Sequence, residues 1–194
     1  MKFTYNEIFL RNQILANIPT QRDGRKLSAG TATSLLLLRI AYQNKMEEYD
    51  GICRKALDDI KKDGKYAGFD EKAQAQEEAK RVLAMKKAYD EWKETDGERP
   101  ACPSQEEIEK AEGAKAESAE FERMMTELTE AYGAARAKQA AVETGIEVNK
   151  LTRAELEDIV GVVGTDGDVR MKTPNGEFDE PCMSFLAMVA KYFA

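Results

Sequence analysis

The chain has 194 residues, a formal charge of −7 and a mean hydropathy of −0.59, with 42% apolar and 34% charged residues. These values exclude a membrane-spanning protein, and they are too apolar for a wholly disordered chain. The sequence contains no histidine, which excludes Ser-His-Asp and Cys-His nucleophiles and every histidine metal ligand.

The N-terminal part predicts two helices. Thr4 and Glu7 have the spacing of a capping box, and Phe3 and Ile8 that of a hydrophobic staple, so we expect a helix over 5–17 that ends before Pro19. A polar loop should follow over 19–26. A second, long helix should then run over 28–63, because apolar residues recur there at spacings of three and four.

The middle of the chain predicts two further helices. A stripe from Ala79 to Trp92 indicates a helix that restarts at 69–70 and ends near 95. Ser104 and Glu107 form a second capping box, which predicts a helix over 105–144, with a front half over 105–120 that projects into solvent or frays. Short connections favour antiparallel neighbours. The expected fold class is therefore mainly α, an elongated antiparallel helical bundle or coiled-coil hairpin.

The pattern changes after Gly145. Residues 146–148 alternate like a short strand, and Thr152 with Glu155 forms a third capping box for a helix to residue 160. Residues 168–178 read as a β-hairpin that turns at 174–176, and a terminal helix follows over 183–193. We therefore expect a helical bundle over 1–145 and a small α+β C-terminal region over 146–194.

The terminal helix is apolar around nearly its whole circumference, and such a helix must be buried. It either packs into its own chain, the alternative we favour because large exposed apolar patches are rare on monomers, or docks on another chain. The candidate partner-binding residues on it are Phe185, Leu186, Met188, Val189, Tyr192 and Phe193.

The sequence shows no recognisable catalytic, cofactor-binding or metal-binding residues. The glycines of 161–167 lack the spacing of a phosphate-binding loop, and Asp166, Asp168 and Glu177 lack that of a calcium loop. Carboxylates such as those at 117, 120 and 127 have no histidine to complete a di-metal motif. Cys102 is the thiol most expected to be exposed. We therefore expect a protein that is not an enzyme and needs no cofactor.

Charge is unevenly spread along the chain. The basic run Arg22, Arg25 and Lys26 could contact an acidic partner, although a solvated loop is the simpler interpretation. The band over 91–130 has 13 acidic and 5 basic residues, which disfavours direct nucleic-acid binding. The same band supports an alternative function, an acidic soluble inhibitor that mimics DNA and binds a host nucleic-acid-binding enzyme.

The order of elements resembles a loose group of short helical-hairpin proteins of tailed bacteriophages. The resemblance is carried by Thr4–Leu15, Lys26–Leu57, Phe121–Leu128 and Gly145–Ile159, which include the segments KMEEYDGICRKAL, FERMMTEL and GIEVNKLTRAELEDI. The extra helix near 70–94 and the apolar terminal helix depart from the pattern. The resemblance implies a non-enzymatic structural or assembly protein that contacts a protein partner or a second copy, without a membrane, in the virion or the host cytoplasm.

Overall fold

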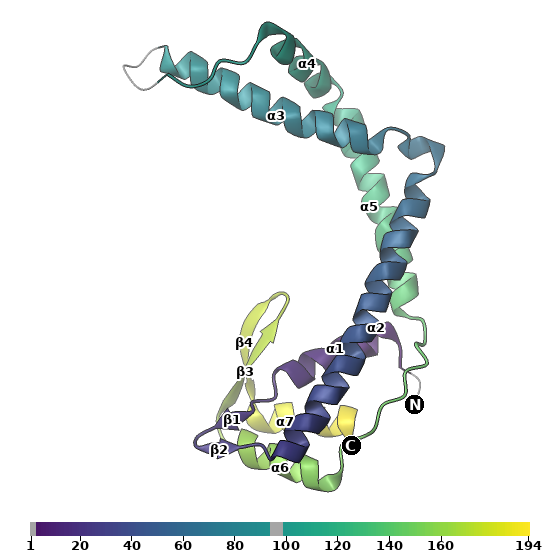
Figure 1. Cartoon of the computed structure of the whole chain (residues 1–194), viewed down its shortest axis with the longest axis vertical. Coiled ribbons are helices and arrows are strands. Elements are labelled where there is room, and N and C mark those ends of the chain that lie inside the picture. The colour runs from purple at the N-terminus through teal and green to yellow at the C-terminus, as the bar shows by residue number, and fades with distance from the viewer. Residues whose placement is uncertain (1–2, 94–98) are drawn as a thin grey trace. The chain divides into compact units, whose positions relative to one another are not determined.

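The computed structural model describes residues 3–93 and 99–194 (Figure 1), and the chain is mainly helical, as predicted. Its described residues form α1 (Tyr5–Ala16), α2 (Ala29–Lys61), η1 (Gly64–Tyr66), α3 (Phe69–Trp92), α4 (Gln105–Ala116), α5 (Ser118–Ala140), α6 (Arg153–Val163) and α7 (Cys182–Phe193). Two short hairpins are formed by β1 (Gln21–Arg22) with β2 (Arg25–Lys26) and by β3 (Asp168–Thr173) with β4 (Gly176–Pro181).

The chain divides into two compact units. The first unit comprises Met1–Cys53 and Arg136–Ala194, and the second comprises Arg54–Ala135. This division differs from the expected boundary at residue 145, because the C-terminal elements pack with the N-terminal helices. In the first unit α7 lies against α1, α6 and the β3–β4 hairpin.

The three predicted capping boxes are all confirmed. In each capping box, the hydroxyl of the cap residue accepts a hydrogen bond from the backbone amide of the third helical residue. The carboxylate of that third residue accepts a hydrogen bond from the backbone amide of the cap residue. The pairs are Thr4 with Glu7, Ser104 with Glu107, and Thr152 with Glu155. These bonds satisfy backbone donors that every helix start leaves free. Local sequence therefore fixes where α1, α4 and α6 begin.

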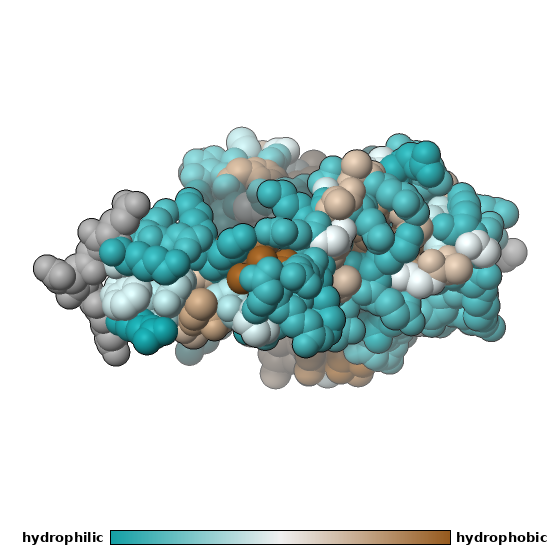
Figure 2. Space-filling view, turned by 90° about the horizontal axis from the view of Figure 1, so that it is seen from above, coloured by the Kyte–Doolittle hydropathy of each residue, from teal (hydrophilic) through white to brown (hydrophobic). Residues whose placement is uncertain are grey.

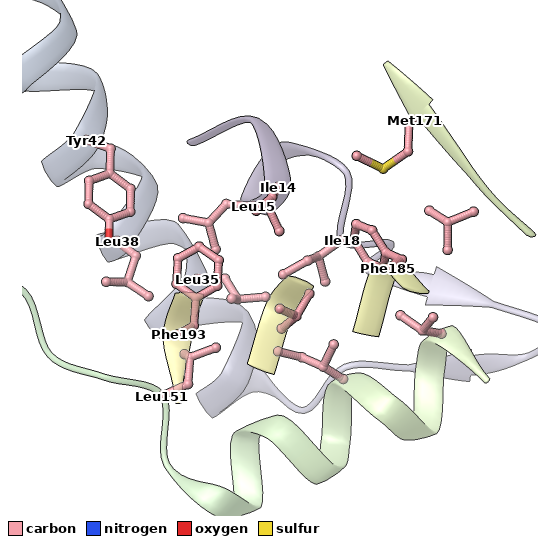
Figure 3. Close-up of a cluster of buried hydrophobic side chains, with 14 of the residues drawn as sticks. Ile14, Leu15, Ile18, Leu35, Leu38, Tyr42, Leu151, Met171, Phe185 and Phe193 are labelled. Carbon is pink, nitrogen blue, oxygen red and sulfur yellow. The ribbon is translucent and has the colours of Figure 1, made fainter. Parts of the chain in front are cut away.

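The core of the first unit gathers side chains from α1, α2, α6, α7 and β3 (Figure 3). Its fully buried members include Ile8 and Ile14 on α1, Tyr42 on α2, Ile159 on α6 and Phe185 on α7. Because these elements come from both ends of the sequence, neither end of the chain can form this core alone.

The segment expected to be a polar loop contains the β1–β2 hairpin instead. Asp23 and Gly24 form its turn with φ values of 50° and 79°, the left-handed conformation that a two-residue type I′ turn requires. Arg22 donates to the Val163 carbonyl at 2.7 Å and to the Cys182 sulfur at 2.9 Å, so it joins the hairpin to α6 and α7. Arg22 thus has a structural role.

The C-terminal hairpin is confirmed. β3 pairs antiparallel with β4, and Val169 and Met171 turn one face of β3 into the core. The strand expected over 146–148 is not formed among the described residues. The neighbouring segment is instead held by Thr144, whose amide donates to the Phe3 carbonyl at 2.8 Å.

The second unit corrects the prediction of one helix over 105–144. The helix breaks at Glu117, and α4 packs against α3 rather than projecting into solvent. Ala79, Val82 and Ala111 are buried between these helices, and the Gln76 side chain donates to the Ala114 carbonyl at 2.6 Å. Small side chains make this packing possible, and their weak apolar pattern is also why the sequence predicted that residues 105–120 face solvent.

The surface nearest the viewer in Figure 2 belongs to α3 and α4 and is mostly hydrophilic.

Candidate functional site

The terminal helix α7 packs within its own chain. Phe185, Val189 and Phe193 are buried in the core of the first unit, and Leu186, Met188 and Tyr192 are partly buried against it. A partner could reach the first three only if α7 left the core. Contact between these six residues and a partner stays a prediction, whereas their part in the core is observed.

A second apolar feature lies on the first turns of α2. Leu36 is 57% exposed, Leu37 62% and Ile40 44%, and we call these three residues the α2 ridge. The four consecutive leucines at 35–38 explain it, since Leu35 and Leu38 face the core and the two between them point outward. Helical spacing places positions 36, 37 and 40 on one side of the helix.

Grooves border the ridge on both sides. One has a volume of about 530 Å³ and is lined by Leu15, Ile18, Leu35 and Leu36 among others. The other has a volume of about 220 Å³ and is lined by Leu37, Leu38, Ala41 and the segment 147–151. Residues of α2 line both grooves, with Leu36 at one and Leu37 at the other. The linings are mixed, because Arg39 also lines the first groove and Glu147 and Lys150 line the second.

Hydrogen bonds tie the start of α2, which carries the ridge, to α6. The Ser28 backbone amide donates to Asp158 on α6 at 2.8 Å, and the Ser28 hydroxyl lies 2.9 Å from that of Thr31. Hydrogen bonds from the Thr31 hydroxyl and the Ser28 amide lower the pKa of Asp158. The start of α2 is thereby joined to α6.

No metal-binding chemistry appears among the described residues, which contain no group of three or more Cys, Asp or Glu placed to hold an ion. Glu120 pairs with Lys72 at 3.0 Å and Glu127 with Arg123 at 3.8 Å, so these carboxylates are surface ion-pair partners. Cys102 is exposed, as expected, and its sulfur lies 3.5 Å from the Pro103 carbonyl oxygen.

The calcium-loop candidates are likewise not brought together as a metal site. Glu177 pairs with Arg170 at 3.1 Å on the outer face of the C-terminal hairpin. None of the helices in the described part of the chain is both long and apolar enough to cross a membrane.

Comparison with known proteins adds no assignment: no protein family, curated protein or solved structure matches this chain. The candidate site therefore rests on geometry alone. The sequence analysis considered α7 and missed the α2 ridge. The run of four leucines over 35–38 could have predicted the ridge. A helix that is buried on one side cannot bury four consecutive side chains, so some of these leucines must be exposed.

Proposed function

We propose that this chain is a non-enzymatic structural or assembly protein of a tailed bacteriophage, and that it works by protein–protein contact through the α2 ridge. The observation that carries the proposal is the exposure of Leu36, Leu37 and Ile40 on one helix beside two grooves that apolar and charged side chains line together. Exposed apolar surface of this kind marks interaction sites on proteins. The phage context is supported by the resemblance in the order of elements.

The occupant that fits the ridge is a second copy of this chain. The stretch from Ala29 to Leu38 carries no charge, so two copies can bring these surfaces together although each has a net charge of −7. The ridge and one wall of each groove belong to α2, so each copy carries both a projecting apolar surface and grooves beside it, as an isologous pair requires. The apolar side chains of one copy can then fill the grooves of the other.

The energy expected from the ridge is modest. Full burial of a Leu or Ile side chain contributes about 1.5–3 kcal/mol, and scaling by the exposed fractions gives roughly 1 kcal/mol for each ridge residue. Two copies together supply about 6 kcal/mol against an association cost of about 4–15 kcal/mol. The proposal therefore predicts a weak, concentration-dependent dimer.

Sedimentation velocity over a range of concentrations tests the dimer. We expect the sedimentation coefficient of the wild-type chain to rise with concentration, and the Leu37→Ser variant to lose this rise, because the change weakens dimerisation by roughly 30-fold. Met183→Ser is the matched control, since Met183 is 60% exposed but lies on α7, and it should associate like wild type. A wild-type chain that stays monomeric, or a control that loses association equally, would contradict the proposal.

The phage context has its own test. If the chain is a structural or assembly protein, it should remain with intact particles or assembly intermediates when an infected-cell lysate is fractionated. Recovery only in the particle-free fraction would contradict this part of the proposal and leave the contact surface to be judged by sedimentation.

The alternative is an acidic inhibitor that mimics DNA. It is supported by the second unit, which holds 21 acidic and 15 basic residues. However, many of its described carboxylates already pair with cations, such as Glu78 with Arg81 and Glu112 with Lys86. Salt separates the two functions, because apolar association persists or strengthens in high salt whereas binding through mimicry weakens.

A further inference from the structure

The hairpin of β3 and β4 has two outer edges, and one side chain covers the edge of β3. Asn17, which follows α1, donates through Nδ2 to the Lys172 carbonyl at 3.1 Å and accepts from the Lys172 amide at 2.7 Å. The side-chain amide therefore pairs with β3 as the backbone of a neighbouring strand would. Nδ2 also donates to the Gln13 carbonyl at 2.8 Å, which ties this cover to the end of α1.

The edge of β4 has no such cover. Lys172 lies opposite Glu177, and opposite residues of an antiparallel pair turn their backbone groups either both toward each other or both away. Because the Lys172 groups point outward to Asn17, the Glu177 groups also point outward, and so do those of Asp179 two positions on. Within the described part of the chain, these two amides and two carbonyls have no hydrogen-bond partner. Residues 176–179 are all exposed, and Figure 1 shows the tip of the hairpin projecting away from α6 and α7.

The side chains of β4 determine which strand fits this edge. On one face of the hairpin, Arg170 lies 3.1 Å from the Glu177 carboxylate and 3.1 Å from that of Asp179. On the other face Met171 lies opposite Phe178, which is 46% exposed. β3 thus meets β4 with a basic, an apolar and a basic residue in succession, in the order Arg-Met-Lys. A strand on the open edge would meet the same β4 side chains from the other side.

A second copy of this chain does not fit the open edge. Two β4 edges in antiparallel contact would set Glu177 and Asp179 against the same carboxylates of the other copy, and like charges directly opposite one another destabilise a strand pair. β3 of a second copy does not fit either, since Asn17 already occupies its outer edge. Charge complementarity therefore favours a different partner, one with basic side chains.

We propose that the β4 edge binds an extended segment of a partner protein in which basic and apolar residues alternate, antiparallel to β4. Its basic residues would lie beside Glu177 and Asp179 and its apolar residue beside Phe178, while its backbone pairs with the open amides and carbonyls. Strand addition of this kind takes its affinity from main-chain hydrogen bonds and its specificity from alternate side chains. This docking edge goes beyond the contact through the α2 ridge and does not depend on it.

Titration of the isotope-labelled full chain with a capped Lys-Val-Lys-Val-Lys peptide, followed by amide chemical shifts, tests the edge. We expect saturable shifts centred on Glu177, Phe178 and Asp179. A peptide of the same composition in the order Lys-Lys-Lys-Val-Val keeps the charge without the alternation, and it should bind about fivefold or more weakly. N-methylation of the lysine nitrogens should abolish binding, because these nitrogens face β4 in the antiparallel pair. The valine nitrogens face away from β4, so N-methylation there should be tolerated.

Two double variants separate this edge from the acidic surface in general. Glu177→Gln with Asp179→Asn removes both edge carboxylates and no backbone group, and it should weaken peptide binding by about fivefold or more. Glu157→Gln with Asp59→Asn is the matched control, because it makes the same change of charge at two exposed helical carboxylates that also pair with cations. The control should bind the peptide like wild type, and so should Leu37→Ser on the α2 ridge.

Several results would overturn the proposal. They are the absence of shifts at millimolar peptide, shifts centred outside β4, equal binding of the two peptide orders, equal effects of the two N-methylations, and an unchanged affinity in the Glu177→Gln, Asp179→Asn variant. Both double variants change surface side chains only, so their thermal midpoints should stay close to that of wild type. A loss of binding in the edge variant with an unchanged midpoint therefore reports the edge and not unfolding.

Discussion

Replacing Phe185 with alanine should strongly destabilise the first unit. Phe185 is fully buried in the first turn of α7, in the same core cluster as side chains of α1, α6 and β3. Truncating a buried phenylalanine removes its transfer free energy and leaves a cavity in a core that is close-packed. If α7 were instead a docking helix that lies outside the core, the same change would cost the isolated chain little.

The expected loss is about 3–5 kcal/mol of unfolding free energy, the usual range for a buried Phe→Ala change. Domains have only about 5–15 kcal/mol in total, so the loss is a large share of the stability of this unit. It should lower the thermal midpoint by roughly 10 °C or more. Met183→Ala is the control, because Met183 lies on the same helix but is exposed, and surface changes stay within about 0.5 kcal/mol.

Thermal and urea denaturation followed by far-UV circular dichroism measures both variants. The Phe185→Ala curve should shift, or its first transition should separate from the rest, while the Met183→Ala curve should overlie that of wild type. An unchanged Phe185→Ala curve would refute the placement of α7 in the core and return it to the role of a docking helix.

Two further predictions concern a titrating tyrosine and a helix cap. Burial and a hydrogen bond to Glu48 raise the pKa of Tyr5 from 10.0 to about 12. Folding therefore favours the neutral phenol, which contributes about 2–3 kcal/mol to the unfolding free energy. This contribution is present below pH 10 and is lost as the pH rises toward 12. Urea midpoints at about pH 9 and about pH 11 should differ less in Tyr5→Phe than in wild type, and an equal difference would contradict the assignment. Ser104→Ala should lower the unfolding free energy by about 1 kcal/mol, because it removes the cap of α4. Thr126→Ala, within α5, is the control and should not lower it. Equal urea midpoints for the two variants would show that the cap contributes nothing to stability.

Much of the fold could be predicted because its signals are local. The capping boxes at Thr4, Ser104 and Thr152 each depend on two residues three positions apart, and all three are present. The C-terminal hairpin and the helix after it follow from alternation, a turn and a proline. The burial of α7 also follows from its composition, since exposing so much apolar surface is unfavourable. Composition favoured its own chain as the partner but left docking on another chain open.

The features that were missed depend on tertiary contacts or on one turn. α4 looked solvated because its buried contacts are made by small side chains such as Ala111, which show no strong apolar stripe. The Asp23–Gly24 turn is a strong hairpin signal, but its strands have two residues each and no apolar alternation. The contact between Asn17 and Lys172 joins residues 155 positions apart, and no local spacing reports it.

The most direct test of the contact function is a photocrosslinking measurement at the ridge. A benzophenone amino acid placed at Ile40 of the otherwise unchanged chain, irradiated in purified protein at high concentration, should give a covalent dimer. Peptide mapping should place the new bond on the ridge or groove residues of the second copy. A product that remains monomeric, or crosslinks that scatter over surfaces outside α2 and its grooves, would contradict the account.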